Sequence, residues 1–135
     1  MADLDAITER IRGCAFKVSA GLGPGFLEKL YENALVIELE RAGLRVARQH
    51  PLAVWYDGIQ IGQFAADLLV EDQILVELKA VRALEDLHLA QALNYLRASL
   101  LPACLLLNFG TPKLEIRRLH PSPSWPRPAA KEPTA

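Results

Sequence analysis

Three charged side chains in the middle of the chain have the residue types and the spacing of a hydrolytic metal site. Asp67 lies within an apolar run, and Glu77 and Lys79 lie two residues apart in the next apolar run. Because alternate residues of a strand share one face of a sheet, Glu77 and Lys79 should stand side by side. Carboxylate oxygens suit a hard divalent cation, and a neighbouring lysine can orient water or stabilise a developing oxyanion. These residues therefore favour metal-assisted hydrolysis.

The two carboxylates meet only if both apolar runs pair as a hairpin in one particular register. A turn centred on Asp72 sets Asp67 opposite Glu77 and Leu68 opposite Val76. Side chains directly opposite each other have Cβ atoms about 5 Å apart, so two carboxylates there need a cation or a raised pKa. A turn centre displaced by one residue would set Asp67 opposite Val76 instead. A solvated sheet face, with Asp67 ending a strand, is the alternative interpretation.

The rest of the chain supplies the elements that must position these residues. Helical spacing of apolar residues predicts helices over 4–18, about 24–42 and 84–99. Alternating or continuous apolar runs predict extended segments over 44–50, 52–56, 59–64, 65–70, 74–81, 103–109 and 113–119. This order of elements predicts a small mixed α/β layer fold.

The second predicted helix carries one more candidate residue. Pro24 suits its first turn and Gly43 suits the position just after its end. The predicted core stripe consists of Leu27, Leu30 with Tyr31, Ala34 and Ile37. Glu28 borders this stripe, so its carboxylate could point under the helix toward the sheet. The alternative is that Glu28 only complements the positive end of the helix dipole.

The third predicted helix presents a polar stripe beside its apolar one. His88, Gln91 and Tyr95 lie at positions i, i+3 and i+7 of this helix. The stripe could face solvent, or it could face a substrate, with Gln91 and Tyr95 touching phosphate or a base. His88 by itself is more typical of a surface or capping histidine.

Composition and charge limit the classes of function. The 15 basic and 16 acidic residues give a net charge of −1, so the strongly basic signature of a nucleic-acid binder is absent. Cys14 and Cys104 have no zinc-ligand spacing and lie in apolar stretches, as expected in a reducing compartment. No signal-peptide layout and no apolar run of about 18 residues is present. We therefore predict a cytoplasmic protein with no membrane partner, consisting of one domain over 1–120 and a Pro-rich flexible tail over 121–135.

Four motifs, in order along the chain, resemble known family patterns. Residues 25–31 are similar to the pattern that names the GxxExxY family, and Asp67 followed by Glu77-Leu78-Lys79 resembles the D…ExK signature of PD-(D/E)XK nucleases. Residues 91–95 resemble the QxxxY element of RecB-like members, and residues 106–110 resemble the LiNFG strand of the GxxExxY family. Over residues 7–119 the chain thus resembles a GxxExxY family protein of the PD-(D/E)XK nuclease superfamily.

This resemblance implies a fold and a set of roles. The fold is a restriction-endonuclease-like core, a central mixed β-sheet flanked by helices. Asp67 and Glu77 would ligate Mg²⁺ or Mn²⁺ together with the Leu78 carbonyl, and Lys79 would position the attacking water or stabilise the pentacovalent phosphate. Glu28 would be a helix acid that supports metal or water. The residues lining the substrate side would be Gln91 and Tyr95.

The function predicted from these features is metal-dependent hydrolysis of phosphodiester bonds in nucleic acid, DNA rather than RNA. A nuclease-fold binding or regulatory subunit without turnover of its own is the alternative, favoured by the near-neutral charge, small size and Pro-rich tail. A structural domain with surface acids is a third possibility. Acids inside a metal site would be offset by bound cations, so the net charge does not exclude a nuclease. It predicts modest affinity for the phosphate backbone, and hence a small footprint, a homo-oligomer or a protein partner.

Overall fold

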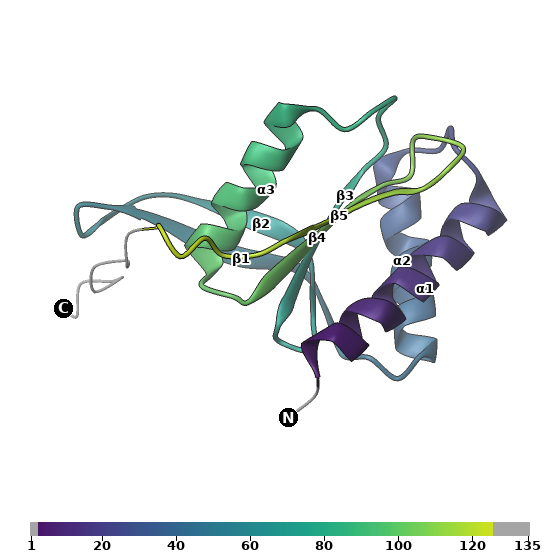
Figure 1. Cartoon of the computed structure of the whole chain (residues 1–135), viewed down its shortest axis with the longest axis horizontal. Helices are drawn as coiled ribbons and strands as arrows, with labels where there is room; N and C mark the ends of the chain where they lie inside the picture. The colour runs from purple at the N-terminus through teal and green to yellow at the C-terminus, as the bar shows by residue number, and fades with distance from the viewer. Residues whose placement is uncertain (1–2, 126–135) are drawn as a thin grey trace.

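The computed structural model of the protein describes residues 3–125, which form one mixed sheet with helices on both faces (Figure 1). Its elements in chain order are α1 (Leu4–Leu22), α2 (Glu28–Arg41), β1 (Val46–Tyr56), β2 (Ile59–Val70), β3 (Ile74–Lys79), α3 (Asp86–Ser99), β4 (Ala103–Asn108) and β5 (Glu115–Leu119). The strands lie in the order β1-β2-β3-β4-β5. Only β3 and β4 pair in parallel, and the other neighbours are antiparallel. The predicted mixed sheet flanked by helices is confirmed.

The two faces of the sheet carry separate apolar layers. Helices α1 and α2 pack on one face, and α3, which connects the parallel strands β3 and β4, packs on the other (Figure 1). The first layer contains the β3 residues Ile74, Val76 and Leu78, and the second contains Leu75. Glu77 and Lys79 therefore share the α3 side of β3 with Leu75, as the alternation of the sequence predicts.

The register of the β2–β3 hairpin matches the prediction. Val70 pairs with Ile74, Leu69 with Leu75, and Leu68 with Val76, so the turn is centred on Asp72. Asp72 itself has a φ of 56°, in the left-handed region that Asp tolerates better than most residues. The hairpin therefore brings Asp67 to the level of Glu77.

Helix α2 differs from the prediction in its start and in its buried face. It begins at Glu28, with Leu27 as its N-cap, and Pro24 lies in the preceding loop. Three of the predicted core residues are exposed, Leu27 at 77%, Leu30 at 45% and Ile37 at 49%. The buried stripe is instead Tyr31, Glu32, Leu35, Val36 and Leu39. The helix is rotated toward this stripe because the Tyr31 ring stacks on Phe109, with ring centroids 4.9 Å apart.

Strands β1 and β2 are each longer than predicted. Pro51 lies inside β1, which is an edge strand, so the missing N–H of proline leaves no interior ladder bond unmade. Two predicted segments, 59–64 and 65–70, form the single strand β2. Asp57 and Gly58, both with positive φ, make the two-residue turn between these strands.

The end of the described chain packs against α3. The Arg97 guanidinium carbon lies 5.9 Å from the Trp125 ring centroid. The rest of the predicted tail, residues 126–135, lies outside the described residues. Within residues 3–125, no helix combines the length and the apolar character needed to cross a membrane.

Two glycine-to-alanine substitutions should change stability in opposite directions. A Cβ on Gly110 would overlap the backbone of Val81, so we expect Gly110→Ala to lower the free energy of unfolding by about 1–3 kcal/mol or more. Gly13 lies exposed in the middle of α1 with open space around it. Gly13→Ala should therefore raise the free energy of unfolding by about 1 kcal/mol. Urea titration of both variants checks this, and equal midpoints for the two would contradict it.

Candidate active site

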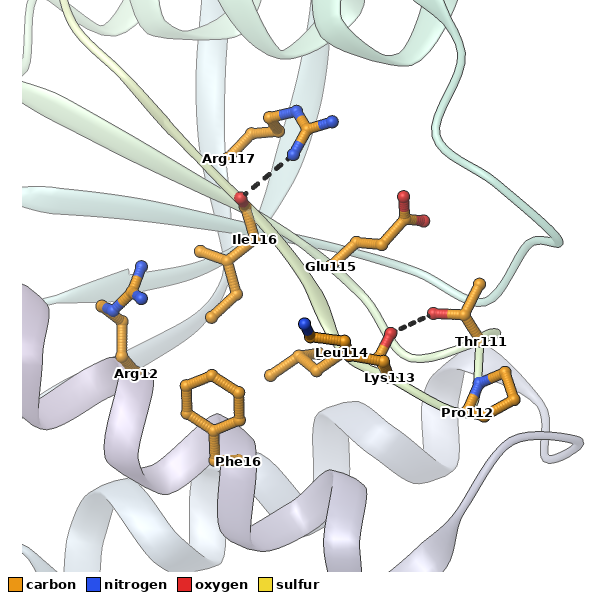
Figure 2. A pocket seen from close by; sticks show the side chains of 9 residues that line it. All are labelled: Arg12, Phe16, Thr111, Pro112, Lys113, Leu114, Glu115, Ile116 and Arg117. Carbon is orange, nitrogen blue, oxygen red and sulfur yellow. Dashed lines mark hydrogen bonds between the residues drawn. The ribbon is translucent and has the colours of Figure 1, made fainter.

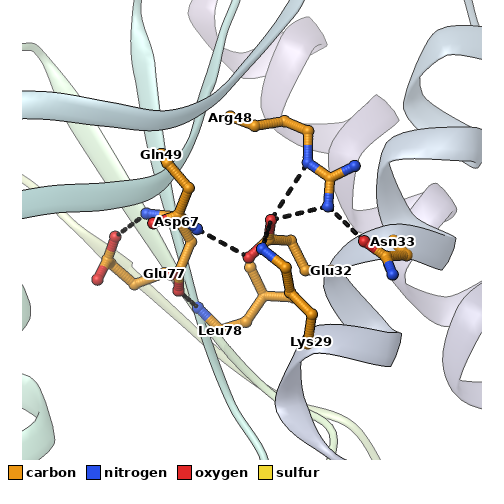
Figure 3. Close-up of polar contacts among 8 residues, drawn as sticks. All are labelled: Lys29, Glu32, Asn33, Arg48, Gln49, Asp67, Glu77 and Leu78. Atoms are coloured by element: carbon orange, nitrogen blue, oxygen red, sulfur yellow. Dashed lines mark hydrogen bonds and ion pairs between the residues drawn. The ribbon is translucent and has the colours of Figure 1, made fainter.

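The backbone ladder between β2 and β3 gives way to side-chain bonds at Asp67 and Glu77. Counting away from the turn, the last backbone pair of the two strands is Leu68 with Val76. Beyond it, the Asp67 backbone N–H donates to Glu77 Oε2 at 2.8 Å, and the Leu78 N–H donates to Asp67 Oδ2 at 2.8 Å (Figure 3). The two carboxylates thus lie between the strands, where backbone groups would otherwise pair.

A backbone carbonyl faces the same gap. In an extended strand, the N–H and the C=O of one residue point to the same edge. The Leu78 N–H points to Asp67, and the Lys79 carbonyl accepts from the Phe109 N–H on the β4 side at 2.8 Å. The Leu78 carbonyl therefore points toward β2 and Asp67. This alternation places one carbonyl at the same gap as the two carboxylates.

The strand opposite Asp67 is also irregular. Arg48 pairs with Leu68 and His50 pairs with Ala66, but the ladder skips Gln49 and Asp67. Gln49 has a φ of 50°, which a non-glycine residue adopts only at a local strain cost. The interruption on both sides frees Asp67 from the regular sheet pattern, which lets its N–H turn toward Glu77.

The carboxylates are held in an environment that disfavours their charges. Glu77 is 6% exposed, and burial together with the Asp67 charge raises its pKa to about 8. Burial also raises the pKa of Asp67, although the Leu78 N–H opposes this effect. Burial and the Asp67 charge raise the pKa of Glu28, while the Lys79 charge lowers the pKa of all three carboxyl groups. The positive charge around these three carboxyl groups is therefore too small to offset their burial and mutual repulsion.

This donor set fits a hard divalent cation. Such an ion takes carboxylate and carbonyl oxygens together with water, and the bonds above use one oxygen of each carboxylate. Among residues 3–125, no group of three His, Cys, Asp or Glu side chains is placed to hold a metal ion. Glu28, the first residue of α2, feels the charge of Asp67, which raises its pKa, but it does not join such a group. Water or substrate oxygens would complete the coordination.

Helix α3 brings the predicted polar stripe to the same place. The Lys79 ammonium donates to Gln91 Oε1 at 3.3 Å. Tyr95 stacks on Phe64, with ring centroids 3.8 Å apart, and burial together with the charges of Glu77 and Asp67 raises its pKa. His88 has the capping role expected of it, since its Nδ1 accepts the Glu85 N–H at 2.9 Å. Gln91 and Tyr95 thus belong to the surroundings of the carboxylates.

A second polar cluster next to the site was not predicted. Glu32 is 4% exposed, and its Oε2 lies 3.0 Å from Arg48 Nη2 and 3.1 Å from Lys29 Nζ (Figure 3). Its Oε1 accepts from Gln49 Nε2 at 3.0 Å. Glu32 precedes Leu35 by one helical turn, and a charged residue on an apolar stripe is a signal that sequence reasoning could have used. No such signal marks Gln49, whose place depends on a local backbone irregularity.

The site lies apart from a surface hollow of about 710 Å³ between α1 and β5 (Figure 2). Phe16 and Ile116 are among the apolar side chains that line it, and Arg12 and Lys113 are among the charged ones. None of the predicted site residues lines it. The chemistry proposed below therefore does not use this hollow.

Comparison with known families identifies the superfamily of the chain. A family model described as the PD-(D/E)XK nuclease superfamily matches residues 5–119. The chain belongs to the PD-(D/E)XK nuclease superfamily. Members of this superfamily are generally nucleases that use divalent metal ions. No curated protein and no solved structure gives a significant match to the chain.

In this PD-(D/E)XK chain, stability without metal should fall as the pH rises from about 5 to about 8. In that window folded Glu77, with a pKa of about 8, keeps a proton that the unfolded chain, with a value of 4.5, has released. The folded state then binds more protons than the unfolded state, so raising the pH lowers the free energy of unfolding. A divalent cation that binds the ionised pair should offset the loss.

Scanning calorimetry at about pH 5.5 and about pH 8, with and without Mg²⁺, measures this effect. The gain in Tm from Mg²⁺ should be larger at the higher pH. Glu77→Gln cannot ionise, so in this variant the metal-free Tm should depend less on pH. A metal-free wild-type Tm that rises across the window would contradict the assignment.

Proposed function

We propose that this protein is a metal-dependent nuclease that hydrolyses phosphodiester bonds in nucleic acid, DNA rather than RNA. The observation that carries the proposal is the opened β2–β3 ladder, in which Asp67 and Glu77 bond across the gap beside the Leu78 carbonyl. Membership of a superfamily whose members are generally nucleases supports it. The place of the chain within the GxxExxY family stays a prediction.

Asp67, Glu77 and the Leu78 carbonyl would hold Mg²⁺ or Mn²⁺. When bound, such an ion activates water and neutralises charge on the phosphate. The peptide N–H groups that bond to the two carboxylates fix their orientation before any ligand arrives. This preorganisation lowers the cost of ordering the site when substrate binds.

Lys79 would act on the phosphate and on the attacking water. Its ammonium group carries three donors, of which Gln91 Oε1 takes one. The other donors remain for a water molecule or for the phosphate oxygens that gain charge in the transition state. Glu28, with its raised pKa, would hold or accept a proton of a water molecule near Asp67. The proposed catalytic residues are therefore Glu28, Asp67, Glu77 and Lys79.

Gln91 and Tyr95 would line the side from which the nucleic acid enters. Tyr95 is fixed by its stack on Phe64, so its position beside the carboxylates does not depend on substrate. A net charge of −1 gives only modest attraction to a phosphate backbone. A homo-oligomer or a protein partner would supply the remaining affinity for nucleic acid. The predicted cytoplasmic location agrees with the presence of two free cysteines in the structure.

The test is cleavage of labelled single-stranded and double-stranded DNA and RNA with Mg²⁺, with Mn²⁺ and with EDTA. Wild type is compared with Asp67→Ala and Lys79→Ala at equal protein concentration. Cleavage by wild type with metal, and its loss with EDTA and in both variants, supports the proposal. Equal activity of all three proteins would contradict the proposal, because it would mean that a contaminant or another site cleaves the nucleic acid.

A further inference from the structure

The Asn108 side chain lies at the end of β4 and bonds to three separate segments. It is fully buried, and its Oδ1 accepts from the backbone N–H groups of Val81 and Gly110, each at 3.0 Å. Its Nδ2 donates to the Val81 carbonyl at 3.0 Å and to Glu115 Oε1 at 2.7 Å. An amide side chain has two donor hydrogens and one acceptor oxygen, and here every one of them is used.

These bonds fix the chain immediately after Lys79. Asn108 is the ladder partner of Lys79, and its amide pairs with Val81 as a backbone peptide would. Glu115 Oε1 also accepts the Leu84 N–H at 3.3 Å. Asn108 and Glu115 therefore hold both ends of the connection from Lys79 toward α3, the helix that carries Gln91.

The next residue, Phe109, reaches the opposite side of the site. Its backbone N–H donates to the Lys79 carbonyl at 2.8 Å, and its ring stacks on Tyr31. The Tyr31 hydroxyl donates to the Gly23 carbonyl at 2.6 Å and accepts the Phe26 N–H at 3.1 Å. These bonds hold the loop that leads into α2, whose first residue is Glu28. Asn108 at the end of β4 and Phe109 just after it thus contact the supports of Lys79 and of Glu28.

We propose that Asn108, Phe109 and Tyr31 are positioning residues of the active site, which set Lys79 and Glu28 at fixed places around the Asp67–Glu77 pair. The proposal rests on the proposed nuclease function. None of the three side chains needs to touch substrate. They act because the groups that do the chemistry come from separate elements, and a displacement of about 1 Å can cost 10²-fold in rate. Asn108 sets the Lys79 side, and the Tyr31–Phe109 stack sets the Glu28 side.

The test of the Lys79 side is an exchange of donor and acceptor. Asn108→Asp keeps the shape of the side chain, but it loses both donated bonds and sets a second carboxylate against Glu115. We expect kcat to fall about 10²-fold with KM little changed. Adding Glu115→Gln restores a donor between these two residues and should recover at least about tenfold in kcat, within the coupling that contacting residues show. If the second substitution recovers no activity, the bond between residues 108 and 115 does not position Lys79, and the proposal is wrong on this side of the site.

A control separates positioning from a general loss of stability. Leu105 is buried in the same strand and lies outside the proposed site, so Leu105→Val should lower Tm without lowering kcat. Tyr31→Phe keeps the ring stack and loses only the hydroxyl bonds, and we expect kcat to fall about tenfold at a small cost in Tm. If Leu105→Val loses as much kcat as Asn108→Asp at equal Tm, the role of Asn108 is only structural and the proposal is wrong.

Amide hydrogen exchange gives a readout that does not depend on activity. In Asn108→Ala, which removes the acceptor of the Val81 and Gly110 N–H groups, exchange at these two residues should accelerate about tenfold or more while the core of α1 stays protected. If wild type cleaves no nucleic acid, the proposed function fails, and this exchange pattern alone decides whether Asn108 holds the segment after Lys79. Uniform acceleration across the whole domain would overturn the positioning role in either case.

Discussion

Replacing Asp67 by Asn should lower nuclease activity severely while leaving the metal-free protein at least as stable as wild type. The amide oxygen can still accept the Leu78 N–H, so the side-chain bond across the strand gap survives. The substitution removes a charge that burial disfavours and that raises the pKa of Glu77. A metal contact supplies several kcal/mol of charge stabilisation in the transition state, so we expect kcat/KM to fall on the order of 10³-fold.

The measurements are cleavage rates, Mg²⁺ binding by calorimetry, and Tm with and without Mg²⁺. The stabilisation by Mg²⁺ should vanish in Asp67→Asn, because a ligand stabilises only the state that binds it. Asp72→Asn is the matched control, since Asp72 lies on the exposed turn of the same hairpin with its side chain 74% exposed. Activity within about tenfold of wild type in Asp67→Asn would remove Asp67 from the metal site.

The hairpin that carries the carboxylates could be predicted because its determinants are local. Leu68 and Val70 pair with Val76 and Ile74 on one face of the sheet, while Leu69 pairs with Leu75 on the other. A slip of one residue would break this matching of the two faces. The register then follows from the turn at Asp72. The effect of the Asp67 charge, which raises the pKa of Glu77, follows from the same register. The core of the candidate site is therefore present in about a dozen consecutive residues.

The orientation of α2 could not be predicted in the same way. Its sequence has two apolar stripes side by side, one through Leu27 and Ile37 and the other through Leu35 and Leu39. The helical period alone does not choose between them. The stack of Tyr31 on Phe109, which is remote in sequence, decides which stripe is buried. The place of Glu28 at the start of the helix depends on this choice.

Side chains that organise the site from a distance escaped prediction for a related reason. Asn108 closes a strand that reads as apolar, and its four bonds join segments that are far apart along the chain. Gln49 reaches Glu32 only because its backbone takes a positive φ inside a strand. Local propensity argues against that conformation. Contacts of this kind depend on tertiary structure, whereas the D…ExK residues can be found from the alternation of side chains along the strands.

Replacing Lys79 by Met should lower kcat about 10²–10³-fold and leave metal binding in place, because Lys79 is proposed to stabilise charge and not to ligate the ion. The methionine side chain keeps the length and the apolar stem of lysine. The Lys79 charge lowers the pKa of Asp67, Glu77 and Glu28. Its removal should therefore shift the pH midpoint of Mg²⁺ binding upward, since the carboxylates then ionise at higher pH.

Single-turnover cleavage at saturating Mg²⁺ separates this effect from a loss of metal. The low cleavage rate of Lys79→Met should persist when the Mg²⁺ concentration is raised. In a variant that lacks a metal ligand, a higher Mg²⁺ concentration should partly restore the rate. Gln91→Ala removes only the acceptor that holds the Lys79 ammonium at 3.3 Å, so its loss in kcat should be smaller, about tenfold. Lys17→Met, in α1 away from the site, should cleave at the wild-type rate. If Mg²⁺ alone restores Lys79→Met, then Lys79 acts by holding the metal site together, because a group that stabilises only transition-state charge cannot be replaced by more of the same ion.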